Sequence, residues 1–164
     1  MRSSSKFISL ARLLAISVSA ACNNTPACGA TLSENLAPDV VELVTSVEEI
    51  EFQPVPGLVG VETALLFGNP DEAGPYAIRV RVAEGVLTPP HFHDQDRQIT
   101  VIEGDWAFGL GSIRTCDDSL TVEAGGVAFH PAGVVHFDGS CGGSVVVQIN
   151  GVGPVNTTLV ADAQ

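Results

Sequence analysis

All four histidines of the chain lie between His91 and His136, and the first two form the pattern His91-Phe92-His93. On a strand, residues i and i+2 point to the same face, so both imidazoles can reach one point. Two imidazoles directed at one point suit a divalent transition metal. By itself the pattern also fits two surface histidines, so the surrounding residues have to decide between these interpretations.

Two spaced motifs surround the histidines. The first runs from Gly85 through His91 and His93 to Gly104, and the second contains Gly125, Pro131, Gly133 and His136. A turn built on Pro131 and Gly133 would place His136 at the start of the next strand. Together they resemble the two motifs of the cupin superfamily, G-x5-H-x-H-x(3,4)-E-x6-G and G-x5-P-x-G-x2-H-x3-N. Ser140 stands in place of the closing asparagine.

The resemblance implies an all-β fold, the double-stranded β-helix or jelly-roll barrel of the cupins, as one domain over residues 38–164. It also implies that His91, His93 and His136 hold a divalent transition metal: Fe, Mn, Zn, Cu or Ni. Cupins commonly pair, so a homodimer is expected from the resemblance as well.

A narrower likeness surrounds the first motif, where the chain is similar to small exported single-domain cupins of largely unassigned activity. Trp106 and Phe108 alternate after Gly104 and are expected to line the barrel as a wall for the substrate. The resemblance therefore implies the fold and the metal site more firmly than it implies a substrate.

The chain departs from the first motif at one ligand. Counting back from Gly104, the position of the cupin glutamate is filled by Arg97. A guanidinium stays protonated and cannot coordinate a metal. Three outcomes stay open: Arg97 binds an anionic substrate beside a three-histidine metal site, it turns outward to an acidic residue, or the metal has been lost. The acidic residues considered for such a pair are Asp94, Asp96 and Glu123.

Gln98 and His130 are weaker candidates for metal ligands. Gln98 would supply a fourth ligand under the longer spacing of the motif, but adjacent residues on a regular strand face opposite sides, so this needs a β-bulge. His130, directly before Pro131, is expected to be a packing or rim histidine.

The elements that must position these residues are short β-runs separated by turn residues, with no sustained helical periodicity. This pattern favours a sandwich or a small barrel. The expected strands are Val40–Glu51, Val61–Phe67, Tyr76–Ala83, Gln98–Leu110, Ser119–Glu123, Gly126–His130, Ser144–Ile149 and Thr157–Val160.

The N-terminal residues are typical of a secretory signal. Arg2, Lys6 and Arg12 precede or open a short apolar run, and small residues follow before Cys22. We expect a signal peptide over 1–21, a flexible linker over 22–37, and a secreted or periplasmic protein. Lipid attachment at Cys22 is the alternative to plain secretion. The apolar run is too short to span a bilayer.

Export makes disulfides available to the four cysteines Cys22, Cys28, Cys116 and Cys141. Three pairings exist. If Cys22 is lipidated or Cys28 lies in a flexible tail, Cys116–Cys141 is the natural pair, and both of these lie in turn-rich stretches.

The negative charge of the chain excludes polyanionic partners. Beyond the signal segment there are four arginines, no lysine and all 19 acidic residues. Such a surface repels nucleic acid and anionic lipid. The expected partner is therefore a small molecule.

Two functions remain open. The first is a metal-dependent enzyme outside the cytoplasm, a dioxygenase if the metal is redox-active and a hydrolase or isomerase if it is zinc. The second is a non-catalytic module that binds a small ligand or a metal, which the missing acidic ligand at Arg97 favours.

Overall fold

The structure is a computed structural model that describes residues 46–163. The expected signal peptide and linker, with Cys22 and Cys28, lie outside these residues. Among the residues described, no helix has the length and apolarity needed to cross a membrane.

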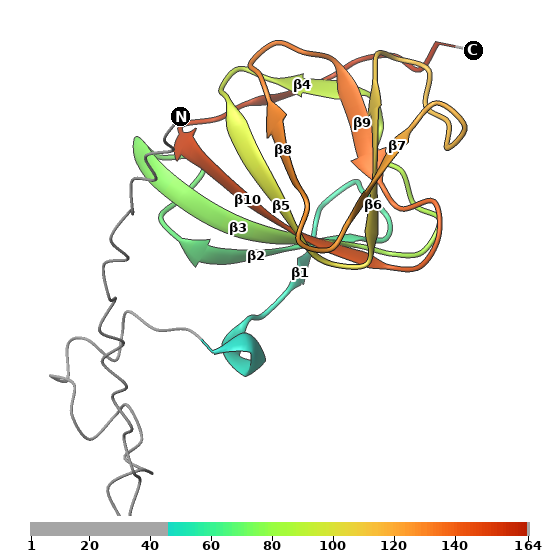
Figure 1. The fold of residues 1–164 in the computed structure, drawn as a ribbon. Coiled ribbons are helices and arrows are strands. Elements are labelled where there is room, and N and C mark those ends of the chain that lie inside the picture. Colours follow the sequence, from blue (N-terminus) through green and yellow to red (C-terminus); the bar gives the residue numbers. More distant parts are fainter. Residues whose placement is uncertain (1–45, 164) are drawn as a thin grey trace, which may run out of the picture. The chain divides into compact units, whose positions relative to one another are not determined.

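Two antiparallel sheets form the domain, and Figure 1 shows them as two layers. The six-stranded sheet consists, in spatial order, of β1 (Gln53–Pro54), β2 (Val61–Phe67), β3 (Gly74–Val82), β10 (Val145–Gly153), β5 (Arg97–Glu103) and β8 (Val127–His130). The five-stranded sheet consists of β11 (Thr157–Leu159), β4 (His91–His93), β9 (His136–Gly139), β6 (Asp105–Leu110) and β7 (Leu120–Glu123). This arrangement is an all-β jelly roll, as the sequence predicts.

The core is built from apolar side chains that alternate with outward-facing residues. On β5, Ile99 and Val101 are buried, and Gln98 between Arg97 and Ile99 is exposed. Trp106 on β6 packs into the same cluster. Because side chains alternate along a strand, Arg97 shares the inward face of Ile99 and Val101.

One long expected strand is divided in two. The run Gln98–Leu110 becomes β5 and β6, which belong to different sheets and are separated by Gly104. Gly104 has a φ of +73°, and a Cβ there would collide with the carbonyl oxygen of Ser144. Only glycine meets both conditions without strain, so the chain turns here from one sheet to the other.

The expected strand Val40–Glu51 is wrong where the structure describes it. Val47–Glu49 form a short 3₁₀ helix, η3, instead. The Glu49 carboxylate accepts a hydrogen bond from the Ser46 backbone N–H at 2.8 Å, which stabilises a turn and not an extended chain. In contrast, the bounds predicted for Val61–Phe67 are confirmed by β2.

A disulfide between Cys116 and Cys141 joins the loop that follows β6 to the loop that follows β9. Their Cα atoms lie 5.8 Å apart and 25 positions apart in the sequence. The bond therefore links two loops of the five-stranded sheet, which also contains β4 and β9.

Candidate metal centre

Three histidines come together on two neighbouring strands. His91 and His93 lie on β4, and His136, the first residue of β9, is the register partner of His91. Their ring centroids are 4.9 Å apart for His91 and His93, 4.4 Å for His91 and His136, and 5.4 Å for His93 and His136. One nitrogen from each ring lies within 4.8 Å of the other two, so the three can reach a single ion.

Each of the three rings is oriented through its Nδ1 atom. The partners of Nδ1 are the Pro89 carbonyl oxygen for His91 (2.7 Å), the Val134 carbonyl oxygen for His136 (2.9 Å) and the Thr157 hydroxyl for His93 (3.0 Å). An Nδ1–H that donates to a carbonyl leaves the lone pair on Nε2, which is the tautomer that binds a metal. The Nε2 atoms of His93 and His136 are buried and have no hydrogen-bond partner. The ligand set thus fits a divalent transition metal.

The loop before β9 is fixed from two sides. The Gly133 N–H donates to the His93 carbonyl oxygen at 2.7 Å, and the Ala132 N–H donates to Asp96 Oδ1 at 2.8 Å. The loop after β4 is held as well, because Asp94 accepts two hydrogen bonds from Asn156, each of 2.7 Å. These contacts hold the two ligand strands and Thr157 in one frame.

Burial keeps the rings of His93 and His136 neutral. It lowers the pKa of His93 to about 2, with smaller contributions in the same direction from Arg97 and the neighbouring imidazoles. Burial also lowers the pKa of His136, although the hydrogen bond that the ring donates to the Val134 carbonyl oxygen and the charge of Asp138 act in the opposite direction. Neutral imidazole is the form that coordinates a metal, so the site is ready for one at neutral pH.

Arg97 faces the interior. Its side chain is 8% exposed and lines the same cavity as His91 and His93. It makes no ion pair with any residue from 46 to 163, and its buried Nε has no hydrogen-bond partner, while the Tyr76 hydroxyl lies near the guanidinium. Burial lowers the pKa of Arg97, while the charge of Asp138 and the Tyr76 hydroxyl act in the opposite direction.

Two of the alternatives considered for this position do not occur. Arg97 does not turn outward to Asp94, Asp96 or Glu123, because its side chain is buried and forms no ion pair with any described residue. Gln98 is exposed on the opposite face of β5, and the bulge in that ladder lies at Val146 and Val147 and not beside Gln98.

The cavity has a volume of about 460 Å³ and a largely aliphatic wall. Trp106 belongs to its lining, whereas Phe108 does not. Phe108 stacks on Trp106 and on His130, with centroid distances of 5.3 Å and 4.8 Å. The apolar lining includes Leu58, Val61, Ile78, Val80, Val147 and Ile149.

Sequence reasoning did not single out Asp138 and Tyr76, and it interpreted His130 as a packing or rim histidine. Asp138 lies two positions after His136 on β9, so the spacing that brought His91 and His93 together could also have indicated it. Burial raises the pKa of Asp138, but the imidazoles of His91, His130 and His136 and the hydrogen bond from the Thr88 hydroxyl lower it by more. The pKa therefore lies below its ordinary value, and the carboxylate is ionised.

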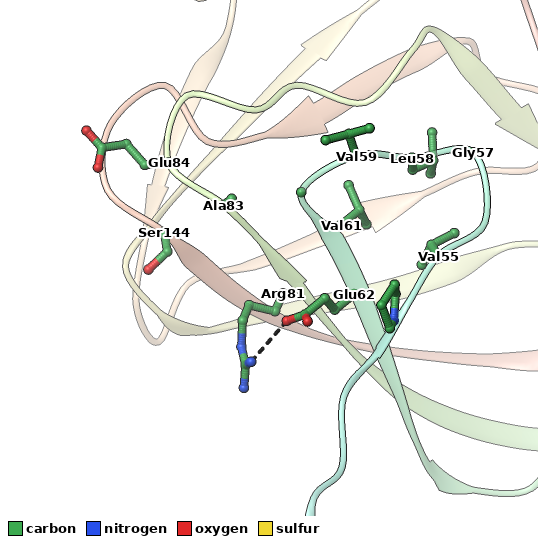
Figure 2. A pocket seen from close by; sticks show the side chains of 12 residues that line it. Val55, Gly57, Leu58, Val59, Val61, Glu62, Arg81, Ala83, Glu84 and Ser144 are labelled. Carbon is green, nitrogen blue, oxygen red and sulfur yellow. Dashed lines mark hydrogen bonds and ion pairs between the residues drawn. The ribbon is translucent and has the colours of Figure 1, made fainter.

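A second hollow on the surface is larger but carries no histidine. This groove has a volume of about 690 Å³. Leu58, Val59 and Val61 are among the residues that line it (Figure 2). At its edge Arg81 and Glu62 form an ion pair of 3.0 Å. With its charged pair already satisfied, the groove offers less chemistry than the histidine cavity.

Comparison with known proteins supports the fold. The family model described as the ChrR cupin-like domain matches residues 40–154. The polyketide cyclase RemF from Streptomyces resistomycificus is 20% identical, with a TM-score of 0.58 over 73% of this chain and 87% of that one. The DMSP lyase DddQ from Ruegeria pomeroyi DSS-3 is 15% identical, with a TM-score of 0.56 over 70% of this chain and 63% of that one.

An RmlC-like cupin from Shewanella frigidimarina is 18% identical, with a TM-score of 0.54 over 67% of this chain and 90% of that one. No curated protein matches the chain. At these identities the structural likeness shows the fold alone.

Proposed function

Because the chain belongs to the ChrR cupin-like family of the cupins, we propose that it is a metal-dependent enzyme acting on a small organic molecule. Its metal ligands are His91, His93 and His136. The observation that carries this proposal is the set of buried imidazoles whose Nδ1 atoms are all engaged, while the Nε2 atoms of His93 and His136 have no partner. A bound ion supplies Lewis acidity and, if it is iron, manganese or copper, a site for oxidation by O2.

Arg97 binds the acidic group of the substrate in this proposal. A buried guanidinium without an anionic partner is costly, because its lost hydration is not replaced. A carboxylate in the cavity would accept two parallel hydrogen bonds from it. Arg97 thereby orients the substrate beside the histidines and stabilises negative charge that develops on it during the reaction.

The rest of the substrate is apolar. Trp106 and the aliphatic side chains around it offer few polar partners, so binding there comes from burial of hydrocarbon. Phe108 lies outside this lining and stacks on the Trp106 ring. A volume of about 460 Å³ fits a small aliphatic or aromatic acid, and a dioxygenase reaction on such a molecule is our leading assignment.

The second candidate is a non-catalytic module that binds the same kind of ligand or only a metal. Arg97 at the position of the family's glutamate favours it, since the usual fourth ligand is missing. The structural neighbours do not decide, because their names include a cyclase, a lyase and a sugar phosphate isomerase. One fold therefore accommodates several reactions.

Elemental analysis and turnover separate the two candidates. The protein is purified from its native compartment, its metal is identified, and O2 uptake and product formation are followed with phenols, diketones and aliphatic and aromatic acids. Turnover that requires the metal and is lost in His91→Ala supports the enzyme. Ligand binding without turnover, across the panel and with each metal, supports the binding module.

We also propose that the chain is exported after cleavage before Cys22. The disulfide fits an oxidising compartment. The intact mass of the protein from its native compartment tests this proposal, since cleavage and lipid attachment give different masses.

A further inference from the structure

His130 is a buried histidine that does not belong to the proposed three-histidine metal site. It is 2% exposed, and neither of its ring nitrogens has a hydrogen-bond partner. The ring is stacked against Phe108, and its centroid lies 4.1 Å from that of His136. Buried polar atoms are nearly always paired, so two unpaired nitrogens on one buried ring indicate a missing partner.

Asp138 supplies a carboxylate to the same place. It follows His136 by two residues on β9 and therefore points to the same face of the sheet. Its Oδ1 accepts a hydrogen bond of 2.8 Å from the Thr88 hydroxyl, and Oδ2 accepts none from residues 46 to 163. One oxygen is thus oriented while the other stays available.

The three side chains are close enough to share an ion. One ligand atom each from His130, His136 and Asp138 lies within 4.8 Å of the other two. Metal–ligand bonds of about 2.0 to 2.2 Å place the ligand atoms about 3 Å apart, so small side-chain rotations close the site. Two histidines and one carboxylate with open positions are a ligand set typical of non-haem iron.

We infer that His130, His136 and Asp138 form a second metal-binding position that overlaps the three-histidine position. His136 has one free nitrogen, Nε2, because Nδ1 is bound to the Val134 carbonyl oxygen. The two positions are therefore occupied alternately, with one ion per chain. This inference rests on the proposed metal-binding function and gives that site a carboxylate.

Charge supports a carboxylate in this second ligand set. The Arg97 guanidinium lines the same cavity as His91 and His93, and it repels a divalent cation held by them. In the second ligand set, the carboxylate of Asp138 contributes a negative charge that offsets this repulsion. The acidic group that the cupin motif normally places on β5 is thus provided from β9.

Metal binding by ligand variants tests the inference. Wild type, His91→Ala/His93→Ala and the same double variant with Asp138→Asn are stripped with chelator. Each is then titrated with Mn²⁺ and with Zn²⁺ by calorimetry, and bound metal is counted after dialysis. We expect one ion per chain in the wild type and in the double variant, and at least tenfold weaker binding once Asp138→Asn is added. Asp105→Asn, an exposed carboxylate on β6, is the control and should not weaken binding.

Several outcomes would overturn the inference. One is a double variant that stays folded by circular dichroism and binds no ion although the wild type binds one. Another is a wild type with two ions per chain, which contradicts the shared ligand. A wild type without any metal affinity would contradict the proposed function as well. X-ray absorption of the loaded double variant provides a second measurement, in which the inference requires two imidazoles and a carboxylate oxygen around the ion.

Discussion

His91 and His136 use the same backbone device: each Nδ1 lies against the carbonyl oxygen of the residue two positions earlier, Pro89 or Val134. The two are also register partners between β4 and β9, with ring centroids 4.4 Å apart. Both rings are therefore oriented by the backbone just before their own strands, before any ion binds. Preorganised ligands lose little freedom on binding, which favours a tight metal site.

Replacement of His136 should remove metal binding altogether. It is common to the three-histidine set and to the set with Asp138, whereas His91 belongs to the first alone. We expect no measurable Mn²⁺ or Zn²⁺ binding by calorimetry in His136→Ala and weakened binding in His91→Ala. Gln98→Ala, an outward-facing change on β5, should bind like the wild type. Equal loss in the two histidine variants would contradict this ranking.

Thr157 holds His93 through a single hydrogen bond of 3.0 Å to Nδ1. Loss of such an outer partner typically weakens metal affinity about 10- to 100-fold. We expect that range for Thr157→Val in a titration with Zn²⁺, together with an unchanged stoichiometry. Thr158→Val is the matched control, because it alters the next residue of β11, whose side chain faces the other side. Similar affinities in the two variants would show that this hydrogen bond does not matter.

Much of this site could be predicted from the sequence, because strand alternation and turn chemistry are local. The pair His91 and His93 needed only the period of a strand, and Gly133 needed only the turn before His136. The division of Gln98–Leu110 at Gly104 was also readable in principle, yet the apolar run continued across the glycine. Nothing local shows that β5 and β6 enter different sheets, since this depends on the packing of Ser144 against Gly104.

The remaining features depend on pairing between distant segments. Thr157 reaches His93 only because β11 pairs with β4, 64 positions away along the chain. The surroundings of Arg97 also depend on distant segments, because its register partners are Gly151 on β10 and His130 on β8. Alternation places Arg97 on the face of Ile99 and Val101, but nothing local shows that His91 and His93 line the same cavity.

Removal of the disulfide should destabilise the domain without changing the metal site. Cys116 and Cys141 are 25 positions apart, and closing a loop of this length contributes about 3 kcal/mol in the chain-entropy model. We expect the free energy of unfolding of Cys116→Ser/Cys141→Ser to be lower by this amount, so that the variant unfolds at a lower urea concentration. Its Zn²⁺ affinity should match that of the wild type, and a weakened affinity would show that these loops also position the histidines.

The metal-free domain should lose stability as the pH falls. Burial lowers the pKa of His130 to about 3 and that of His93 to about 2, while both rings take up a proton near pH 6.5 in the unfolded chain. The unfolded state therefore binds more protons between pH 6.5 and 3. Each of these two histidines lowers the free energy of unfolding by about 1.4 kcal/mol for every pH unit of acidification in this window. Urea unfolding across this window measures the slope, which should be smaller in His130→Gln. A flat profile would contradict the buried, neutral state of these rings.

Replacement of Arg97 should raise stability and abolish the binding of acids. The wild-type side chain is 8% exposed, its Nε has no hydrogen-bond partner, and it forms no ion pair within the described chain, so the ligand-free protein carries a buried charge without a salt bridge. Methionine has a similar reach and no charge, and replacing buried ion pairs by apolar residues often stabilises a protein by about 1–4 kcal/mol. We expect Arg97→Met to unfold at higher urea concentration and to bind aliphatic and aromatic carboxylates at least tenfold more weakly. Arg114→Met, which removes a surface ion pair with Asp162, should change stability by less than about 1 kcal/mol and leave carboxylate binding unaltered. A destabilised Arg97→Met would show that attraction to Asp138 outweighs the cost of burying the guanidinium.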